Sequence, residues 1–155
     1  MKVNGPWTLD EVDRFLAETR VPLRLAAHGS SGHPVLVSLW FLPMDGRLWC
    51  ATQRSAHAHR LLERDPRCGF EVSVESPPYR GVRGTATATL HPERGEEILR
   101  RLIDRFLGGD RSQLAQTLLE RADDEVAIAI EPITLVTWDF EERMREVVRD
   151  PVARR

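Results

Sequence analysis

The segment 47–70, RLWCATQRSAHAHRLLERDPRCGF, constrains the fold more than any other, because its pattern changes from strand to helix and back to strand. Residues 48–52 are mostly apolar or β-branched, as in a buried strand. Ser55 is a residue type that often caps a helix, and apolar residues then recur at helical spacing until Pro66 ends the helix. Hydroxyl and cationic side chains crowd the junction, residues 52–60, which we call the elbow.

Most of the remaining chain is predicted to form strands. Asp45-Gly46 lies between two apolar runs, which is a strong hairpin signal. Thr85, Thr87 and Thr89 alternate with small residues, as in a strand. Strands are expected at residues 22–28, 35–42, 48–52, 68–74, 82–90 and 126–140, the last bent near Pro132. The first three should form an antiparallel meander. The predicted class is mainly β, a small six-stranded antiparallel barrel with peripheral helices.

Helices are predicted outside the segment 47–70 as well. Thr8 and Glu11 match a capping box at the start of a first helix, which ends at Pro22. A longer helix is expected over about 92–107 and a shorter one over about 111–120, both from the spacing of apolar residues.

Size and charge restrict the classes of function. The 155 residues fit one domain, expected over 1–140, followed by a charged tail over 141–155 that we expect to be mobile. A net charge of −2 argues against a nucleic-acid partner, and no apolar run is long enough to span a membrane. The N-terminus lacks the apolar core of a signal peptide, so a cytoplasmic protein is expected. Cys50 and Cys68 are expected to be reduced and buried.

The elbow has the chemistry of an anion site. A helix N-terminus presents unpaired N–H groups and the positive end of its dipole. Thr52 and Ser55 can donate hydroxyl hydrogen bonds, Arg54 can bind a phosphate with two nitrogens, and His57 adds charge if protonated. The alternative is a capped helix with a solvated basic face. His57 and His59 do not share a helix face and have no evident third ligand, so no metal site is expected.

Two further clusters have both a functional and a structural interpretation. In the segment 76–84, Arg80 and Arg83 could reach one anionic ligand, while Gly81 and Gly84 would let a backbone or a flat ligand approach. The alternative is an edge loop with exposed arginines. Aromatic residues in strands more often form core or a subunit interface than a site, and here they are Trp40, Phe41, Trp49 and Trp138.

Taken in order, four segments resemble the pyridoxamine 5'-phosphate oxidase-like family of FMN-binding split barrels. They are HPVLVSLWF (33–41), the segment 47–70, YRGVRGTATAT (79–89) and ITLVTWDF (133–140). The resemblance covers about residues 9–140, and its most diagnostic part runs from Ser55 to Arg67. It implies a six-stranded antiparallel split barrel that forms a homodimer and holds FMN in a cleft between the subunits.

The resemblance also implies three groups of cofactor-binding residues. The isoalloxazine ring would be lined by Val37, Ser38, Leu39 and Trp40. The ribityl phosphate would be held by Thr52, Arg54, Ser55 and His57. The flavin would be approached from the fifth strand, across the dimer, by Arg80 and Val82, with Trp138 packed nearby.

The sequence departs from the family at several positions. Many relatives have lysine at His57 and asparagine at Arg60. The segment 33–41 lacks the arginine and lysine of true pyridoxamine phosphate oxidases, and their C-terminal substrate signature is absent, so vitamin salvage is not expected. The expected function is an FMN-dependent oxidoreductase with an unknown small-molecule substrate. Alternatives are a deazaflavin-dependent reductase and a flavin-binding module without turnover. Since a flavin carries the chemistry, no catalytic residue is assigned.

Overall fold

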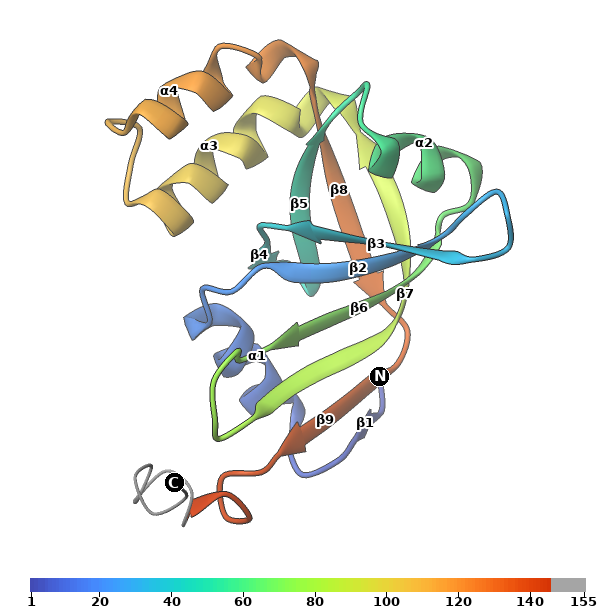
Figure 1. The fold of residues 1–155 in the computed structure, drawn as a ribbon, viewed down its shortest axis with the longest axis vertical. Coiled ribbons are helices and arrows are strands. Elements are labelled where there is room, and N and C mark those ends of the chain that lie inside the picture. The colour runs from blue at the N-terminus through green and yellow to red at the C-terminus, as the bar shows by residue number, and fades with distance from the viewer. Residues whose placement is uncertain (146–155) are drawn as a thin grey trace, which may run out of the picture.

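The computed structural model describes residues 1–145, so most of the expected tail lies outside the described residues. The strands are β1 (Val3–Asn4), β2 (Leu23–His28), β3 (Pro34–Leu39), β4 (Leu42–Met44), β5 (Arg47–Gln53), β6 (Arg67–Ser73), β7 (Arg80–His91), β8 (Glu125–Pro132) and β9 (Leu135–Asp139). They form one curled sheet in the order β3-β2-β6-β7-β8-β5-β4, in which β9 pairs with β7 and β1 pairs with β9 (Figure 1). The prediction of a mainly β, antiparallel barrel-like fold is confirmed.

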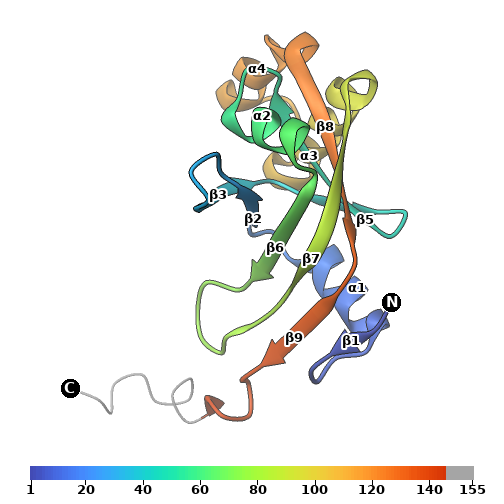
Figure 2. The ribbon, with the colours of Figure 1, turned by 90° about the vertical axis from the view of Figure 1, so that its right-hand side faces the viewer.

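The helices lie at the ends of this sheet. They are α1 (Leu9–Glu18), α2 (His57–Arg64), α3 (Gly95–Leu107) and α4 (Gln113–Leu119), with 3-10 turns at Pro92–Arg94 and Ala122–Asp124. Figure 2 shows α2, α3 and α4 gathered at one end, while β9 and β1 lie at the other. The predicted capping box at Thr8 and Glu11 is present and starts α1. Among the described residues, no helix combines the length and the apolar composition needed to cross a bilayer.

β7 is the central strand of the sheet and pairs with β6, β8 and β9. On one side it pairs with β6 over residues 81–87, and on the other its second half pairs with β8 and its first half with β9. The predicted strand 126–140 is therefore two strands, because the chain leaves the ladder after Pro132, which has no N–H to donate. The Thr85 carbonyl accepts the N–H of Ile133 at 2.8 Å across this bend.

The predicted strand 35–42 is also broken, so the predicted meander is present as two separate antiparallel hairpins, β2–β3 and β4–β5. β3 and β4 follow each other in the chain, but they lie at opposite edges of the sheet. Between them Phe41 turns into the core, where it is fully buried. The physical reason is that burying this apolar ring stabilises the fold by more free energy than continuing an edge strand would. The crossing at Trp40 and Phe41 therefore brings the two edges of the curled sheet together.

Both faces of β5 are buried, which explains why its sequence is continuously apolar rather than alternating. Leu48 and Cys50 belong to the main core inside the curled sheet. Trp49 and Ala51 point the other way, toward α3. Gln53 continues this second face, and Thr52 continues the first. Cys50 and Cys68 are both free and buried, as predicted.

Candidate functional site

The elbow differs from the prediction at Ser55, which does not cap α2. Ala56 is the N-cap residue, and it makes no side-chain hydrogen bond to the helix. Ser55 precedes the cap position by one residue, because the N–H of Ala56 bonds to the carbonyl of Gln53 at 2.9 Å and closes a turn first. The carbonyl of Ser55 instead accepts a hydrogen bond of 2.5 Å from Arg60. The first N–H groups of α2 are therefore left without a side-chain partner.

The side chains expected to hold a phosphate differ in exposure. Arg54, Ser55 and His57 are exposed at the start of α2, whereas Thr52 is 9% exposed and faces the main core. The N–H of Arg54 donates to the carbonyl of Asp124 at 2.8 Å, which fixes the elbow to the turn before β8. Among residues 1–145, the Arg54 side chain forms no ion pair. His59, in contrast to His57, is buried, so the two histidines lie in different environments.

The end of β3 lies beside the elbow. Val37 and Leu39 pack against the main core, and Ser38 is exposed on the opposite face of β3. Trp40 stacks on Phe106 of α3, with ring centroids 5.1 Å apart and an interplanar angle of 6°. A cavity of about 280 Å³ adjoins this strand end; it is lined by Ser38, Leu39, Trp40, Ala51, Leu99, Leu102, Leu114, Leu118 and Glu125. We call it the α3–α4 cavity.

The remaining predicted residues lie at the opposite end of the sheet from the elbow. Arg80 is exposed at the start of β7, and Trp138 lies on the neighbouring strand β9. The side chain of Val82 is fully buried in the core, so only its backbone could meet a ligand. Ala51, the residue before the elbow, is aligned through Ala127 of β8 with His91, so the elbow lies beyond the other end of β7. The separation is about 30 Å along the strand, so one chain does not bring these residues to the elbow.

The expectation of a close approach at Gly81 and Gly84 is met by the chain itself. A methyl group on Gly84 would overlap the carbonyl oxygen of Thr134, which lies between β8 and β9. One on Gly81 would lie 2.6 Å from the ring of Trp138 on β9. That ring is also covered by Arg83, whose guanidinium carbon lies 5.5 Å from its centroid. The glycines therefore make room for β9.

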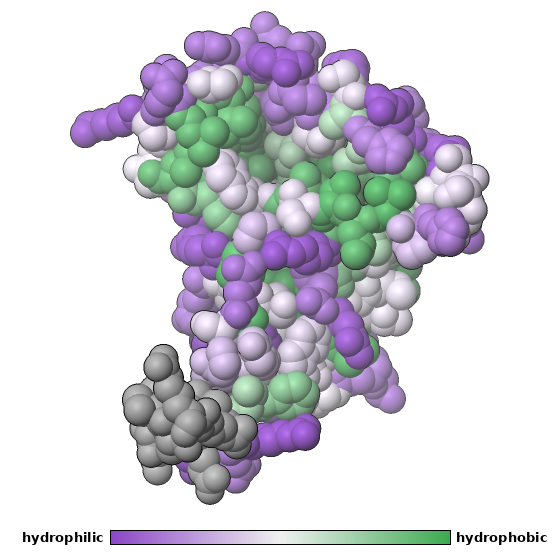
Figure 3. All heavy atoms as spheres, viewed as in Figure 1, coloured by the Kyte–Doolittle hydropathy of each residue, from purple (hydrophilic) through white to green (hydrophobic). Residues whose placement is uncertain are grey.

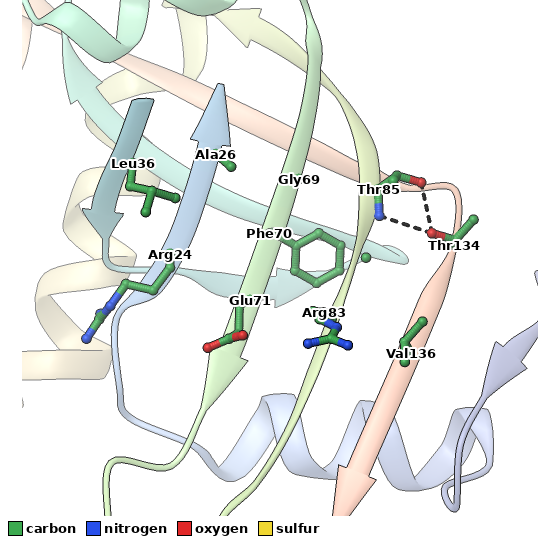
Figure 4. Close-up of a pocket in the computed structure, with 11 residues that line it drawn as sticks. Arg24, Ala26, Leu36, Gly69, Phe70, Glu71, Arg83, Thr85, Thr134 and Val136 are labelled. Atoms are coloured by element: carbon green, nitrogen blue, oxygen red, sulfur yellow. Dashed lines mark hydrogen bonds between the residues drawn. The ribbon is translucent and has the colours of Figure 1, made fainter. Parts of the chain in front are cut away.

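A second cavity, about 520 Å³, lies on the outer face of the sheet, and the sequence did not reveal it (Figure 4). Its residues come from β2, β3, β6, β7 and β9: Arg24, Ala26, Leu36, Gly69, Phe70, Glu71, Arg83, Gly84, Thr85, Thr134 and Val136. None of the predicted cofactor residues lines it. The strand register sets Leu36, Ala26, Gly69 and Thr85 in one row across the face. Alternation within each strand indicates which residues face outward, but only the register shows that they meet.

This surface, which we call the outer sheet face, combines exposed apolar side chains with charged side chains that are hydrogen-bonded to neighbours. Leu36 is 71% exposed on it. Arg24 donates to Glu75 at 2.7 Å, and Ser73 donates to Glu71 at 3.0 Å. Figure 3 shows apolar surface gathered in the half of the molecule that holds β2, β3, α3 and α4. Exposed apolar surface of this kind is typical of an interaction surface.

Several solved structures have the same arrangement. A conserved hypothetical protein from Mycobacterium tuberculosis matches with a TM-score of 0.75 and 22% identity, over 89% of this chain and 88% of that one. An F420 reductase matches with a TM-score of 0.68 and 19% identity, over 84% and 97%. A Listeria innocua protein assigned as a pyridoxamine 5'-phosphate oxidase matches with a TM-score of 0.64 and 16% identity, over 83% and 95%.

The chain has the pyridoxamine 5'-phosphate oxidase-like split-barrel fold. No protein-family model matches the sequence, and no curated protein matches it at a significant level. At these identities the similarity establishes the split barrel and leaves the activity to be argued from the residues. One of the three structures is an F420 reductase and another is assigned as a pyridoxamine 5'-phosphate oxidase. The same fold therefore occurs in proteins with different named activities.

Proposed function

We propose that this split barrel binds FMN at the elbow and uses it to oxidise or reduce a small molecule. One observation carries the proposal: Arg54, Ser55 and His57 are exposed together beside the uncapped N-terminus of α2. Unpaired N–H groups, a hydroxyl and a guanidinium form the donor set that a phosphate monoester requires. Because Ser55 does not cap the helix, its hydroxyl remains available to a ligand.

Within one chain, only some of the residues predicted to contact the flavin ring lie near the elbow. Ser38 and Trp40 line a cavity together with Ala51, the residue before the elbow, and can line a flat ring. Arg80 and Trp138 lie at the other end of the sheet and cannot contact the same ligand. A two-fold partner packed on the outer sheet face would place its own Arg80 and Trp138 near the first elbow. The proposal therefore includes a homodimer with the cofactor cleft at its interface.

In this arrangement each part of the chain has a stated role. FMN, when bound, supplies the two-electron chemistry at its ring. Arg54, Ser55 and the α2 amides hold the phosphate. Ser38 and the β3 backbone orient the ring by hydrogen bonding, and Trp40, fixed by its stack on Phe106, shields it from water. The imidazole of His57, exposed at the start of α2, can add a hydrogen bond to the same phosphate.

The test is a fluorescence titration of the purified protein with FMN. Replacing Arg54 with Ala, or Ser55 and His57 together with Ala, removes charge-assisted hydrogen bonds that each contribute about 1.5–3 kcal/mol, or about 10- to 150-fold in affinity. Arg100→Ala is the matched control, because Arg100 is exposed on α3 and, within residues 1–145, its ion pair is with Glu96. Unchanged FMN affinity in both elbow variants would remove the elbow from the site.

The dimer has its own test. Leu36→Lys places a charge on the outer sheet face, and it should lower the sedimentation coefficient from that of a dimer to that of a monomer. Leu9→Lys changes a leucine that is 42% exposed on α1, away from this face, and should leave the association unchanged. A wild-type protein that sediments as a monomer at micromolar concentration would contradict the shared cleft.

A deazaflavin coenzyme is the second candidate, and Arg60 favours it. The bond from Arg60 to the Ser55 carbonyl holds a further guanidinium at the elbow. Arg54, His57 and Arg60 together suit a longer and more anionic tail than a single phosphate. Competition between FMN and the deazaflavin in one titration distinguishes the two. A flavin that binds but is reduced by neither NADPH nor NADH would instead favour a binding module without turnover.

A further inference from the structure

The α3–α4 cavity differs from the elbow because most of the residues that line it are apolar. They come from β3, β5, α3 and α4, and the two polar residues among them are Ser38 and Glu125. No lysine, arginine or histidine is among the residues that line it. A pocket with a mostly apolar wall and one or two placed polar groups is typical of a small-molecule site.

The position of Glu125 is fixed by three contacts. It lies directly opposite Gln53 across the β5–β8 pair, so both side chains share the face that α3 covers. Gln53 Nε2 donates a hydrogen bond to Glu125 Oε1. The backbone carbonyl of Glu125 lies so close to Gly95, at the start of α3, that no side chain would fit there. The residue is 6% exposed, and it lines the cavity.

The surroundings favour the neutral acid. Burial raises the pKa of the Glu125 carboxyl, and the nearby charge of Asp124 raises it further. The hydrogen bond from Gln53 and the charge of Arg121 lower it by less. A lining without a cation disfavours an anionic ligand, and the Glu125 carboxyl can donate a hydrogen bond to an uncharged acceptor when it carries its proton.

We infer that the α3–α4 cavity binds a small, uncharged, largely apolar molecule that bears a hydrogen-bond acceptor, and that Glu125 donates the hydrogen bond to it. Ser38, Leu39 and Trp40 line the cavity and are also the residues proposed to line the flavin ring. As a substrate site the cavity therefore rests on the proposed function, whereas binding to the cavity does not. Glu125 is then the residue that positions the substrate and can give it a proton.

The experiment uses 4-nitrophenol as the probe and the protein without added flavin. The neutral phenol should bind in the cavity, and its absorbance should shift toward the protonated form, because no cation there stabilises the phenolate. The matched probe is 4-nitrobenzoate, which has the same ring but a permanent charge near neutral pH, and it should bind at least tenfold more weakly. Calorimetry gives both affinities.

Two variants locate the binding. Leu114→Trp adds bulk at a lining residue that is 50% exposed on α4, so it should fold normally and reduce 4-nitrophenol affinity at least fivefold. Leu9→Trp, on α1, is the control and should change nothing. Glu125→Gln keeps an oxygen for Gln53 and a neutral hydrogen-bond donor, so it should retain the preference for the neutral probe.

The outcomes separate the two proposals. Equal binding of the two probes, or unchanged 4-nitrophenol affinity in Leu114→Trp, would overturn the cavity site. FMN binding without probe binding overturns the cavity alone. If the protein binds 4-nitrophenol but no flavin, and Leu114→Trp removes that binding, the result supports the cavity site and contradicts the proposed function.

Discussion

Arg105 of α3 donates a hydrogen bond of 2.7 Å to the carbonyl oxygen of Leu16, near the end of α1. The same guanidinium donates to Ala17 at 3.0 Å and to Thr19 at 2.8 Å. It also lies over the ring of Phe41, 5.2 Å from the centroid. One side chain thus satisfies carbonyls that the end of α1 leaves unpaired and joins α1 to α3.

Arg105→Ala should therefore destabilise the protein by about 2–3 kcal/mol, because several half-buried carbonyls lose a charged donor. The measurement is equilibrium urea unfolding. Arg100→Ala, on the exposed face of the same helix, should cost no more than about 0.5 kcal/mol, since its pair with Glu96 is on the surface. Equal losses in the two variants would contradict the role given to Arg105.

Gly84 and Gly69 are diagonal neighbours in the β6–β7 pair, but they should respond differently to an added methyl group. Gly84→Ala meets the Thr134 carbonyl and the Phe70 ring, and should cost about 3 kcal/mol or more because the backbone must move. Gly69→Ala meets nothing closer than 3.6 Å and should change stability by no more than about 1 kcal/mol. Thermal melts of the two variants decide this, and a tolerated Gly84→Ala would disprove the tight approach of β9.

Glu125 should make stability depend on pH. Its pKa is raised in the folded protein, mainly by burial, so the folded state binds the proton more tightly than the unfolded chain. The neutral acid therefore stabilises the folded protein below the unfolded pKa of about 4.3, and this stabilisation is lost as pH rises through the pKa of the folded state. Glu125→Gln should thus gain stability relative to wild type between pH 4 and pH 8. A stability difference that stays constant over this range would refute the shift.

The two thiols should be unreactive in the folded protein. Burial raises the pKa of Cys68 to about 11, and it raises that of Cys50 further. Because the thiolate is the reactive form, neither thiol should react readily with a disulfide reagent at pH 8. Both should react within seconds in denaturant. Fast labelling of one native thiol would show that its strand opens to solvent.

Features that depend on nearby residues were predictable from the sequence. The capping box at Thr8 and Glu11 and the turn at Asp45-Gly46 involve neighbours in the chain, and both are present. Ser55 was assigned as a cap by residue type, but the turn closed by Gln53 moved the helix start to His57. Each residue of the segment 35–42 suits a strand and predicts a continuous one, but burial of Phe41 breaks it.

The sequence by itself determined the mainly β class, the helices and the exposed elbow, since periodicity, turns and caps act over a few residues. Only the tertiary structure decided the strand order, the outer sheet face and the α3–α4 cavity. Leu36 meets Ala26 and Gly69 through strand register, and Glu125 meets Gln53 from 72 positions away. These contacts depend on which distant strands pair and in which register, and a one-residue shift would reverse every side chain.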